Sequence, residues 1–115
     1  MRKAQLKKTL LPTIALMAIF FATTVQAAGD AIKGESYYAV CAGCHGADGM
    51  GMEAANAPRL QGQFDWYLIT QINNFRSGAR GVHKDDKYGA TMRAMAGTLP
   101  NDQAVLDVVA YISKL

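Results

Sequence analysis

The sequence is poor in the residues that bind metal ions or cross-link small proteins. Its 115 residues include only two cysteines and two histidines. A structural zinc site takes four Cys or His ligands, and the adjacent Cys44 and His45 would be awkward joint ligands on one tetrahedral ion. The composition therefore disfavours a zinc site, even with His83 added. Two cysteines still allow one disulfide, which must be weighed against their spacing.

Patterns typical of strands and of nucleic-acid binding are also missing. No alternating or β-branched run precedes Cys41, although a thioredoxin-like redox pair would follow such a strand. No stripe of Lys and Arg interleaved with aromatic residues indicates contact with nucleic acid. We therefore expect neither a thioredoxin-like redox site nor a nucleic-acid partner.

Residues 1–27 have the three parts of a secretory signal peptide. Basic residues open it, an apolar stretch runs from Leu10 to about Ala22, and Val25-Gln26-Ala27 matches a cleavage pattern of small residues. The apolar stretch is short for a membrane span and is not followed by basic stop-transfer residues. We expect residues 28–115 to form one mature domain in the periplasm, and an uncleaved membrane anchor is the alternative.

Removing this leader changes the charge balance. Four of the twelve basic residues lie within it, which leaves eight against nine Asp and Glu, a formal charge of minus one. The basic balance of the whole sequence is therefore no argument for a nucleic-acid or membrane-surface partner. We expect the mature domain not to be membrane-inserted. At this size an apolar core alone gives marginal stability, so a staple, a metal or a cofactor is expected to supplement it.

The two cysteines belong to Cys41-Ala42-Gly43-Cys44-His45, the C-x-x-C-H pattern for covalent attachment of haem. Thiols three residues apart on a helix lie on one side of it, where both can reach the vinyl groups of one porphyrin. The histidine can offer an imidazole nitrogen to the iron. A simple disulfide would leave this histidine without a role. We therefore predict one covalent haem c and its iron, bound through Cys41, Cys44 and His45.

Three segments have the spacing of amphipathic helices, which predicts an all-α fold. Asp30 can cap a helix over Ala31–Cys41, a second is expected from about Phe64 to Arg76, and a third follows Pro100 with Asn101 as N-cap. Their apolar positions are Tyr37 and Cys41 with Tyr38 beside them in the first helix, Trp66, Ile69 and Ile72 flanked by Leu68 and Phe75 in the second, and Val105, Val108, Val109 and Ile112 in the third.

Two segments between these helices are expected to be irregular, from Gly46 to about Gly62 and from Ser77 to about Thr91. Long loops are uncommon in a small domain unless they are functional, and wrapping a large flat cofactor would account for both. Trp66 and Tyr67 could line the haem crevice or fill the core beneath the second helix, and we expect them to fill the core. Arg59, Arg76 and Arg80 could pair with the haem propionates, but a solvated helix or loop surface is the more common place for such residues.

The chain resembles the class I c-type cytochromes, in particular one domain of the bacterial dihaem cytochromes c and their small monohaem relatives. The resemblance covers residues 29–115 and rests on Gly29-Asp30-Ala31, Cys41 to Gly46, Ala57 to Gln63, Tyr67-Leu68 with Gln71, Leu99, and Ala110-Tyr111-Ile112.

The resemblance implies a small class I cytochrome c fold, with three main helices and loops wrapped around one covalently attached haem. It also implies that the first and last helices cross near-perpendicularly, with Gly34 and Tyr111 as candidates for the crossing. The Pro58 carbonyl is expected to accept the His45 Nδ1 proton, which would orient the ring and strengthen it as a ligand.

Four methionines of the mature chain compete for the second axial position of the iron. Met50 and Met52 follow His45 too closely to reach the opposite face of the ring, and we expect them to fill gaps in a loop. Met92 lies seven residues before Leu99, where the resemblance places the methionine ligand. We prefer Met92 to Met95, which remains the alternative. His83 lies among charged residues and is expected on the surface.

His/Met ligation is typical of an electron carrier rather than an enzyme, because both axial positions are filled and little geometry changes with oxidation state. We expect a monomer that carries one electron at a time between respiratory redox partners, a reductase and an oxidase or dehydrogenase, through transient contacts. Two alternatives stay open. The iron could have an open or labile sixth site for peroxide or a gas, or the domain could be the electron-entry subunit of a larger dehydrogenase.

Overall fold

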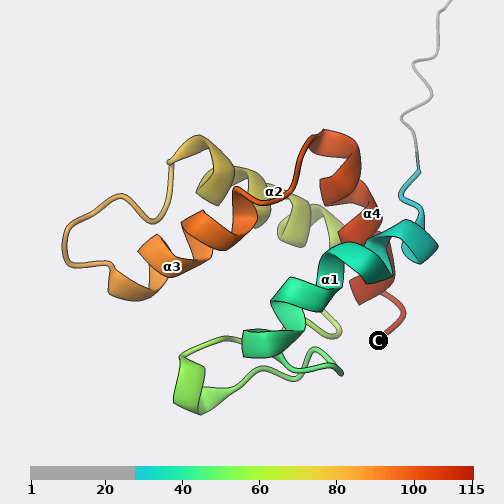
Figure 1. The fold of residues 1–115 in the computed structure, drawn as a ribbon, viewed down its shortest axis with the longest axis horizontal. Helices are drawn as coiled ribbons and strands as arrows, with labels where there is room; N and C mark the ends of the chain where they lie inside the picture. Colours follow the sequence, from blue (N-terminus) through green and yellow to red (C-terminus); the bar gives the residue numbers. More distant parts are fainter. Residues whose placement is uncertain (1–27) are drawn as a thin grey trace, which may run out of the picture.

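The structure, a computed structural model, describes residues 28–115. The expected signal peptide, residues 1–27, lies outside the described residues. Within 28–115 the chain is helical, and its only strand-like feature is an isolated bridge between Met52 and Ala57. No helix of this part combines the length and apolar character needed to cross a bilayer. The elements are α1 (Ala31–His45), the short 3-10 helix η1 (Glu53–Ala55), α2 (Asp65–Ser77), α3 (Lys87–Ala96) and α4 (Asp102–Ile112) (Figure 1).

Helix α1 begins and ends where local chemistry dictates. The Asp30 side chain accepts hydrogen bonds from the backbone N–H groups of Ile32 and Lys33, which confirms it as the N-cap. The helix ends at Gly46, whose φ of 83° is accessible chiefly to glycine. The expected end at Cys41 was too early. The helix continues through His45, so the whole haem-attachment pattern lies on one regular helix.

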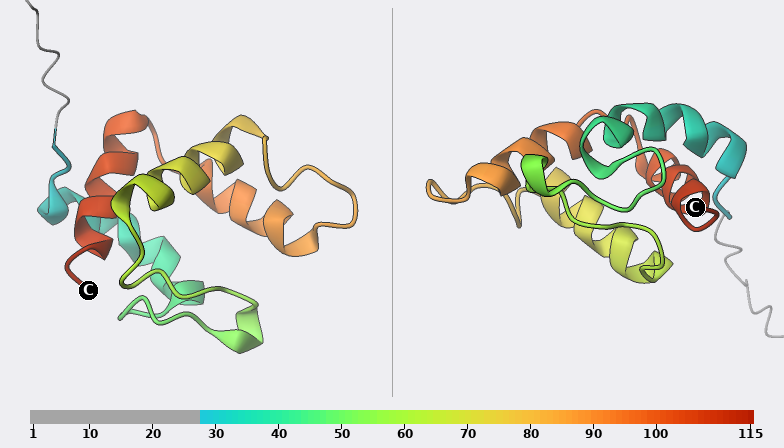
Figure 2. Two further views of the ribbon diagram at one scale, coloured as in Figure 1. Left: turned by 180° about the vertical axis from the view of Figure 1, so that it is seen from behind. Right: turned by 90° about the horizontal axis from the view of Figure 1, so that it is seen from below.

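Helices α1 and α4 lie side by side, and glycine lets their backbones meet (Figures 1 and 2). A Cβ on Gly34 would lie 1.9 Å from the Asp107 carbonyl oxygen and 3.0 Å from the Tyr111 Cβ. Gly34 and Tyr111 are therefore confirmed as contact residues between the first and last helices. Because no side chain separates the two backbones here, α4 fixes the position of α1 closely.

The core is built on α4. Its expected apolar stripe is confirmed, since Val105, Val108, Val109 and Ile112 are at most 3 % exposed. Tyr38 of α1 packs from one side, with its ring centroid 5.3 Å from that of Tyr111. The other buried apolar residues are Leu68, Ile72 and Phe75 of α2, with Ala96, Leu99 and Ala104.

The sequence predicted that Ser77–Thr91 is irregular throughout. This prediction is wrong for the last part of the segment, because α3 begins at Lys87. Its N-cap is Asp86, whose carboxylate accepts the Gly89 N–H at 2.7 Å. A Cβ on Gly89 would lie 2.0 Å from that carboxylate, so glycine is needed for this cap. Gly89 therefore permits the first turn of a helix within the segment that was expected to be irregular.

The expectation that Trp66 fills the core is wrong. Trp66 is 66 % exposed and stacks on the exposed Phe64, and Tyr67 is 39 % exposed. The buried face of α2 consists of Leu68, Ile72 and Phe75, at positions i, i+4 and i+7. The apolar stripe predicted from the sequence is rotated around the helix relative to this buried face. The error arose because Trp66, Ile69 and Ile72 also recur at a helical spacing.

A buried carboxylate joins the start of α1 to α4. Asp107 is 3 % exposed, and its Oδ1 accepts the Asp30 backbone N–H and the Gln103 Nε2 amide, each at 2.8 Å. These hydrogen bonds, the backbone bond first, lower the pKa of the Asp107 carboxyl below its usual range, although burial acts in the opposite direction. The charged form of Asp107 is therefore the one that the fold stabilises.

We expect Gly34→Ala to lower the free energy of unfolding by about 3 kcal/mol, because the added methyl overlaps the Asp107 carbonyl. Gly43→Ala is the matched control on α1, since a Cβ there meets nothing within 4 Å. It should stabilise the helix by about 0.5–1 kcal/mol. Denaturant titration followed by circular dichroism measures both. Equal effects of the two substitutions would contradict the close helix contact.

The lowered pKa of Asp107 predicts acid sensitivity. Its stabilising contribution is complete above the unfolded-state pKa of about 4 and is lost as the pH falls through the lower folded-state pKa. Asp107→Asn should cost about 1–2 kcal/mol at neutral pH, where a charged acceptor is lost. On a curve of unfolding free energy against pH, the variant should also lose less free energy than the wild-type protein as the pH is lowered into the acid range. Glu35→Gln on exposed α1 surface should leave the curve unchanged, and an unchanged curve for Asp107→Asn would contradict this role.

Candidate functional site

The last turn of α1 presents two thiols and an imidazole together. Cys41 and Cys44 are both free and partly buried, one turn apart. Burial raises the pKa of the Cys41 thiol, and the neighbouring Cys44 raises it further. Redox-active thiol pairs of the thioredoxin type instead need a lowered pKa. The raised pKa of Cys41 therefore does not favour a thioredoxin-like redox site.

The imidazole of His45 is buried and held by one specific contact. Its ring is 7 % exposed, and Nδ1 lies 2.7 Å from the Pro58 carbonyl oxygen. Because a carbonyl only accepts, Nδ1 must donate its proton, and the lone pair of the neutral ring then resides on Nε2. This is the contact that the family resemblance implied for Pro58. It prepares Nε2 to act as a metal ligand.

The loop that follows α1 folds back on itself (Figure 2), and its Pro58 carbonyl lies against the His45 imidazole. The Gly49 carbonyl accepts the N–H groups of Leu60 at 2.8 Å and Gln61 at 3.0 Å, across a turn closed by the Met52–Ala57 bridge. At its start, the buried Tyr38 hydroxyl donates to the Gly46 carbonyl at 2.7 Å. The segment is irregular, as expected, yet its backbone is extensively hydrogen-bonded.

Gly51 is a site residue that the sequence reasoning missed. Its N–H donates to the His45 carbonyl at 2.7 Å, and its φ is 84°. A Cβ on Gly51 would lie 2.8 Å from the carbonyl carbon of Pro58 and 2.7 Å from the Arg59 nitrogen. Gly51 thus contacts the backbones of both His45 and Pro58, and its lack of a side chain sets their separation. Only its place in a glycine-rich loop could have signalled this role.

The methionines differ in their surroundings. Met92 on α3 is partly buried and packs against the core, whereas Met95 is 37 % exposed. Met50 and Met52 are 48 % and 42 % exposed in the loop, so they do not fill gaps there. Packing therefore separates Met92 from the other three, and its role as a ligand stays a prediction.

The arginines considered as propionate partners each bond within the chain. Arg76 donates to Asp102 at 2.7 Å, Arg80 donates to Gln71 at 2.6 Å, and Arg59 donates to Gln61. The Arg80 guanidinium also lies over the Phe75 ring, 4.4 Å from its centroid. The side chain of His83 is 73 % exposed, which confirms it as a surface histidine.

Cys41, Cys44 and His45 fit the chemistry of a covalently attached haem. The two free thiols lie on one helical turn, and the adjacent imidazole has its Nδ1 proton engaged by a carbonyl. Thioether formation needs two reduced thiols, and iron needs a neutral imidazole nitrogen. The residue types and their arrangement on one helical turn therefore fit this group.

The sequence model described as Cytochrome c matches residues 31–115. The chain belongs to the cytochrome c family. It is 40 % identical over 86 residues to cytochrome c-554(548) of Halomonas halodenitrificans, a match covering 75 % of this chain and 96 % of the relative. It is 37 % identical over 100 residues to cytochrome c4 of Pseudomonas aeruginosa, covering 85 % of this chain and 44 % of the relative. The chain thus spans less than half of the length of cytochrome c4.

Membership of the cytochrome c family identifies the cofactor. The protein is a haem c protein with covalently bound iron porphyrin. It is also 43 % identical over 70 residues to a thiosulfate dehydrogenase electron acceptor of Stutzerimonas stutzeri, covering 61 % of this chain and 28 % of that relative. The all-α fold expected from the sequence is confirmed.

Gly51→Ala should disturb the contact between His45 and Pro58. We expect a loss of about 3–4 kcal/mol in unfolding free energy, combining the positive-φ cost with displacement of the Pro58 backbone. The NMR signal of the His45 Nδ1 proton should move upfield as its hydrogen bond lengthens. Gly62→Ala is the matched control, because Gly62 has a φ of 78° but only the flexible end of Arg59 nearby, at 3.6 Å.

That control should cost about 1–2 kcal/mol, the price of the left-handed conformation alone, and leave the Nδ1 signal in place. If the two alanine variants lose equal stability and both keep the Nδ1 signal, Gly51 does not set the separation of His45 and Pro58.

Proposed function

We propose that this protein is an exported electron carrier whose single haem is bound through Cys41 and Cys44 and whose iron is ligated by His45 and Met92. The observation that carries the proposal is the buried His45 ring, with Nδ1 2.7 Å from the Pro58 carbonyl, next to two free thiols on the same turn. A disulfide would not need this fixed tautomer, and the described residues hold no group of three or more His, Cys, Asp and Glu side chains that could bind a zinc ion.

The second axial ligand determines whether the iron carries electrons or binds substrates. Met92 is the methionine that packs against the core, so its thioether can be held in one place. A thioether favours ferrous iron and raises the reduction potential relative to two imidazoles. With both axial positions filled, little rearrangement accompanies oxidation, and no position is open to oxygen or peroxide. Axial ligation by both His45 and Met92 therefore supports an electron carrier, whereas an enzyme that acts at the iron would need one axial position free.

The names of two relatives refer to dehydrogenases, and they support a redox protein as the partner of this chain. One is a thiosulfate dehydrogenase electron acceptor and another is the cytochrome subunit of a sulfide dehydrogenase. We infer that this protein receives electrons from a dehydrogenase or reductase and passes them to an oxidase through transient contacts. The leader pattern of residues 1–27 supports delivery of residues 28–115 to the periplasm.

Intact mass and visible spectroscopy test the proposal on protein matured in a host that attaches haem. One retained haem and a chain beginning at Ala28 are expected. In the ferric protein, the absorption band characteristic of methionine-bound iron should be lost in Met92→Ala. Met95→Ala is the matched control on the same helix and should keep the band.

Carbon monoxide separates the carrier from an open-site haem protein. The ferrous wild-type protein should bind it slowly and weakly, because Met92 must first dissociate, and Met92→Ala should bind it rapidly. Rapid binding by the wild-type protein would contradict the carrier. A colourless matured chain with free or disulfide-linked thiols would contradict haem attachment itself.

A further inference from the structure

One glutamine joins the loop that carries Pro58 to the turn after α4. This loop, residues 46–64 between α1 and α2, is called the Pro58 loop below. The Gln61 side-chain amide donates to the Leu115 carbonyl at 2.6 Å, although the two residues are 54 positions apart in the chain. The Gln61 backbone N–H donates to the Gly49 carbonyl at 3.0 Å. Gln61 thus contacts the first part of the loop through its backbone and the turn after α4 through its side chain.

The residue that accepts this hydrogen bond is itself held in place. Leu115 is half-buried and packs against the core, and its N–H donates to the Ile112 carbonyl at 3.1 Å. Its side chain also lies against the loop, because a Cβ on Gly49 would be 3.1 Å from the Leu115 Cδ1. Gly49 is buried and has a φ of 69°, so glycine lets the loop approach closely here. The amide of Gln61 therefore bonds at a packed contact between the Pro58 loop and the turn after α4.

The remaining polar groups of Gln61 bond to Arg59. The Arg59 guanidinium donates to the Gln61 backbone carbonyl at 2.9 Å and to the Gln61 side-chain oxygen at 3.0 Å. A guanidinium only donates and a carbonyl only accepts, so the two partners fix the direction of the amide, with its nitrogen toward Leu115. Because Arg59 follows Pro58 directly in the chain, the contact of Gln61 with the turn after α4 is linked to the residue that accepts from His45.

His45 and Pro58 are therefore positioned by two separate contacts with the C-terminal part of the chain. His45 lies on α1, which meets α4 at Gly34 with no room for a side chain. Pro58 lies on the loop that Gln61 joins to the turn after α4. The 2.7 Å between the His45 Nδ1 and the Pro58 carbonyl oxygen depends on both contacts. Loss of either contact would change the length of this hydrogen bond.

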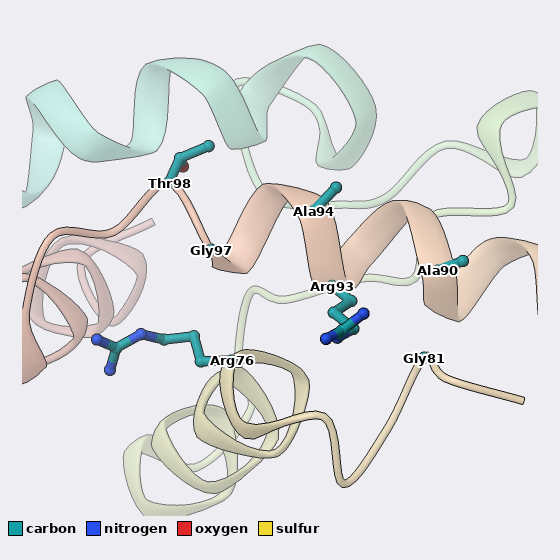
Figure 3. A pocket seen from close by; sticks show the side chains of 7 residues that line it. All are labelled: Arg76, Gly81, Ala90, Arg93, Ala94, Gly97 and Thr98. Atoms are coloured by element: carbon teal, nitrogen blue, oxygen red, sulfur yellow. The ribbon is translucent and has the colours of Figure 1, made fainter.

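Side chains of α2 also bond to α4 and to the turn after it, but these contacts hold α2 rather than the Pro58 loop. Arg76 points toward α4 in Figure 3, and it pairs with Asp102 at 2.7 Å at the beginning of that helix. Asp65, the first residue of α2, accepts the Ser113 hydroxyl at 2.5 Å. The Ser113 contact involves the same turn as the Gln61 contact, which makes it a matched comparison.

We propose that Gln61 is a positioning residue for the iron ligand His45. Its amide holds the Pro58 carbonyl at hydrogen-bond distance from Nδ1, and this hydrogen bond increases the donor strength of Nε2. A stronger imidazole donor favours ferric iron and so lowers the reduction potential. Gln61 thereby influences the potential, although it is none of the predicted haem-binding residues. This inference rests on the proposed function, in which His45 ligates the iron.

Gln61→Leu tests this role on the haem-containing protein, because leucine removes the amide and leaves the charge unchanged. In the ferrous protein, the NMR signal of the His45 Nδ1 proton should move upfield as the hydrogen bond to Pro58 lengthens. The equilibrium constant for reduction should increase about threefold, which is a rise of about 28 mV in potential at about 59 mV per tenfold change for one electron. A redox titration followed by visible absorption measures this rise.

Two further variants separate the amide from other effects. Ser113→Ala removes a side-chain contact of the same turn, so its Tm should fall, but the Nδ1 signal and the potential should stay at the wild-type values. Gln61→Glu keeps an acceptor for Arg59 and loses the donor to Leu115, so its Nδ1 signal should move as in Gln61→Leu. An unchanged signal in Gln61→Glu would assign the effect to Arg59 and contradict the role of the amide.

Three further results would overturn the inference. The first is a wild-type Nδ1 signal and potential in Gln61→Leu. The second is a shift of the potential in Ser113→Ala as large as that in Gln61→Leu, because general loosening of the turn would then suffice. The third is a displaced Nδ1 signal with an unchanged potential, because the hydrogen bond would then not affect the iron. A matured chain without haem would instead contradict the proposed function, and its absorption spectrum shows this before any variant is compared.

Discussion

The direct contact between the backbones of α1 and α4 is the constraint on which the site depends. Gly34 lies against the Asp107 carbonyl with no room for a side chain, and the other end of the same rigid helix carries Cys41, Cys44 and His45. A helix fixed at one end points its other end in a defined direction. The loop that returns Pro58 is in turn hydrogen-bonded to the last turn of this helix, so core packing and site geometry are parts of one arrangement.

The sequence predicted the fold where a local pattern had one physical meaning. Asp30 and Asn101 are N-caps in the structure as expected, and the valine stripe of α4 is buried. The predictions failed where a local pattern allowed two structural interpretations. Gly89 reads as a loop residue, yet it makes room for the Asp86 carboxylate that caps α3, and Trp66 has helical spacing but lies outside the buried face. Both errors concern tertiary surroundings, which periodicity does not contain.

The candidate site divides in the same way. Cys41, Cys44 and His45 could be predicted because covalent haem attachment requires those residue types at that spacing, and the contact of Pro58 with His45 was available from the family resemblance. Gly51 could not be predicted, because its importance comes from a close approach between two backbone segments that only the folded loop creates. A residue whose function is to have no side chain leaves little signal in a single sequence.

The α1–α4 contact also has a consequence for biogenesis. The hydrogen bond from the Asp30 N–H to Asp107 joins residues 77 positions apart, and contacts of such long sequence separation form late because loop closure is costly in entropy. Until the C-terminal helix has been made, the glycine face of the first helix has no surface to rest on. While α4 is undocked, Cys41 and Cys44 therefore lie on an open chain, in which both thiols are accessible for thioether formation.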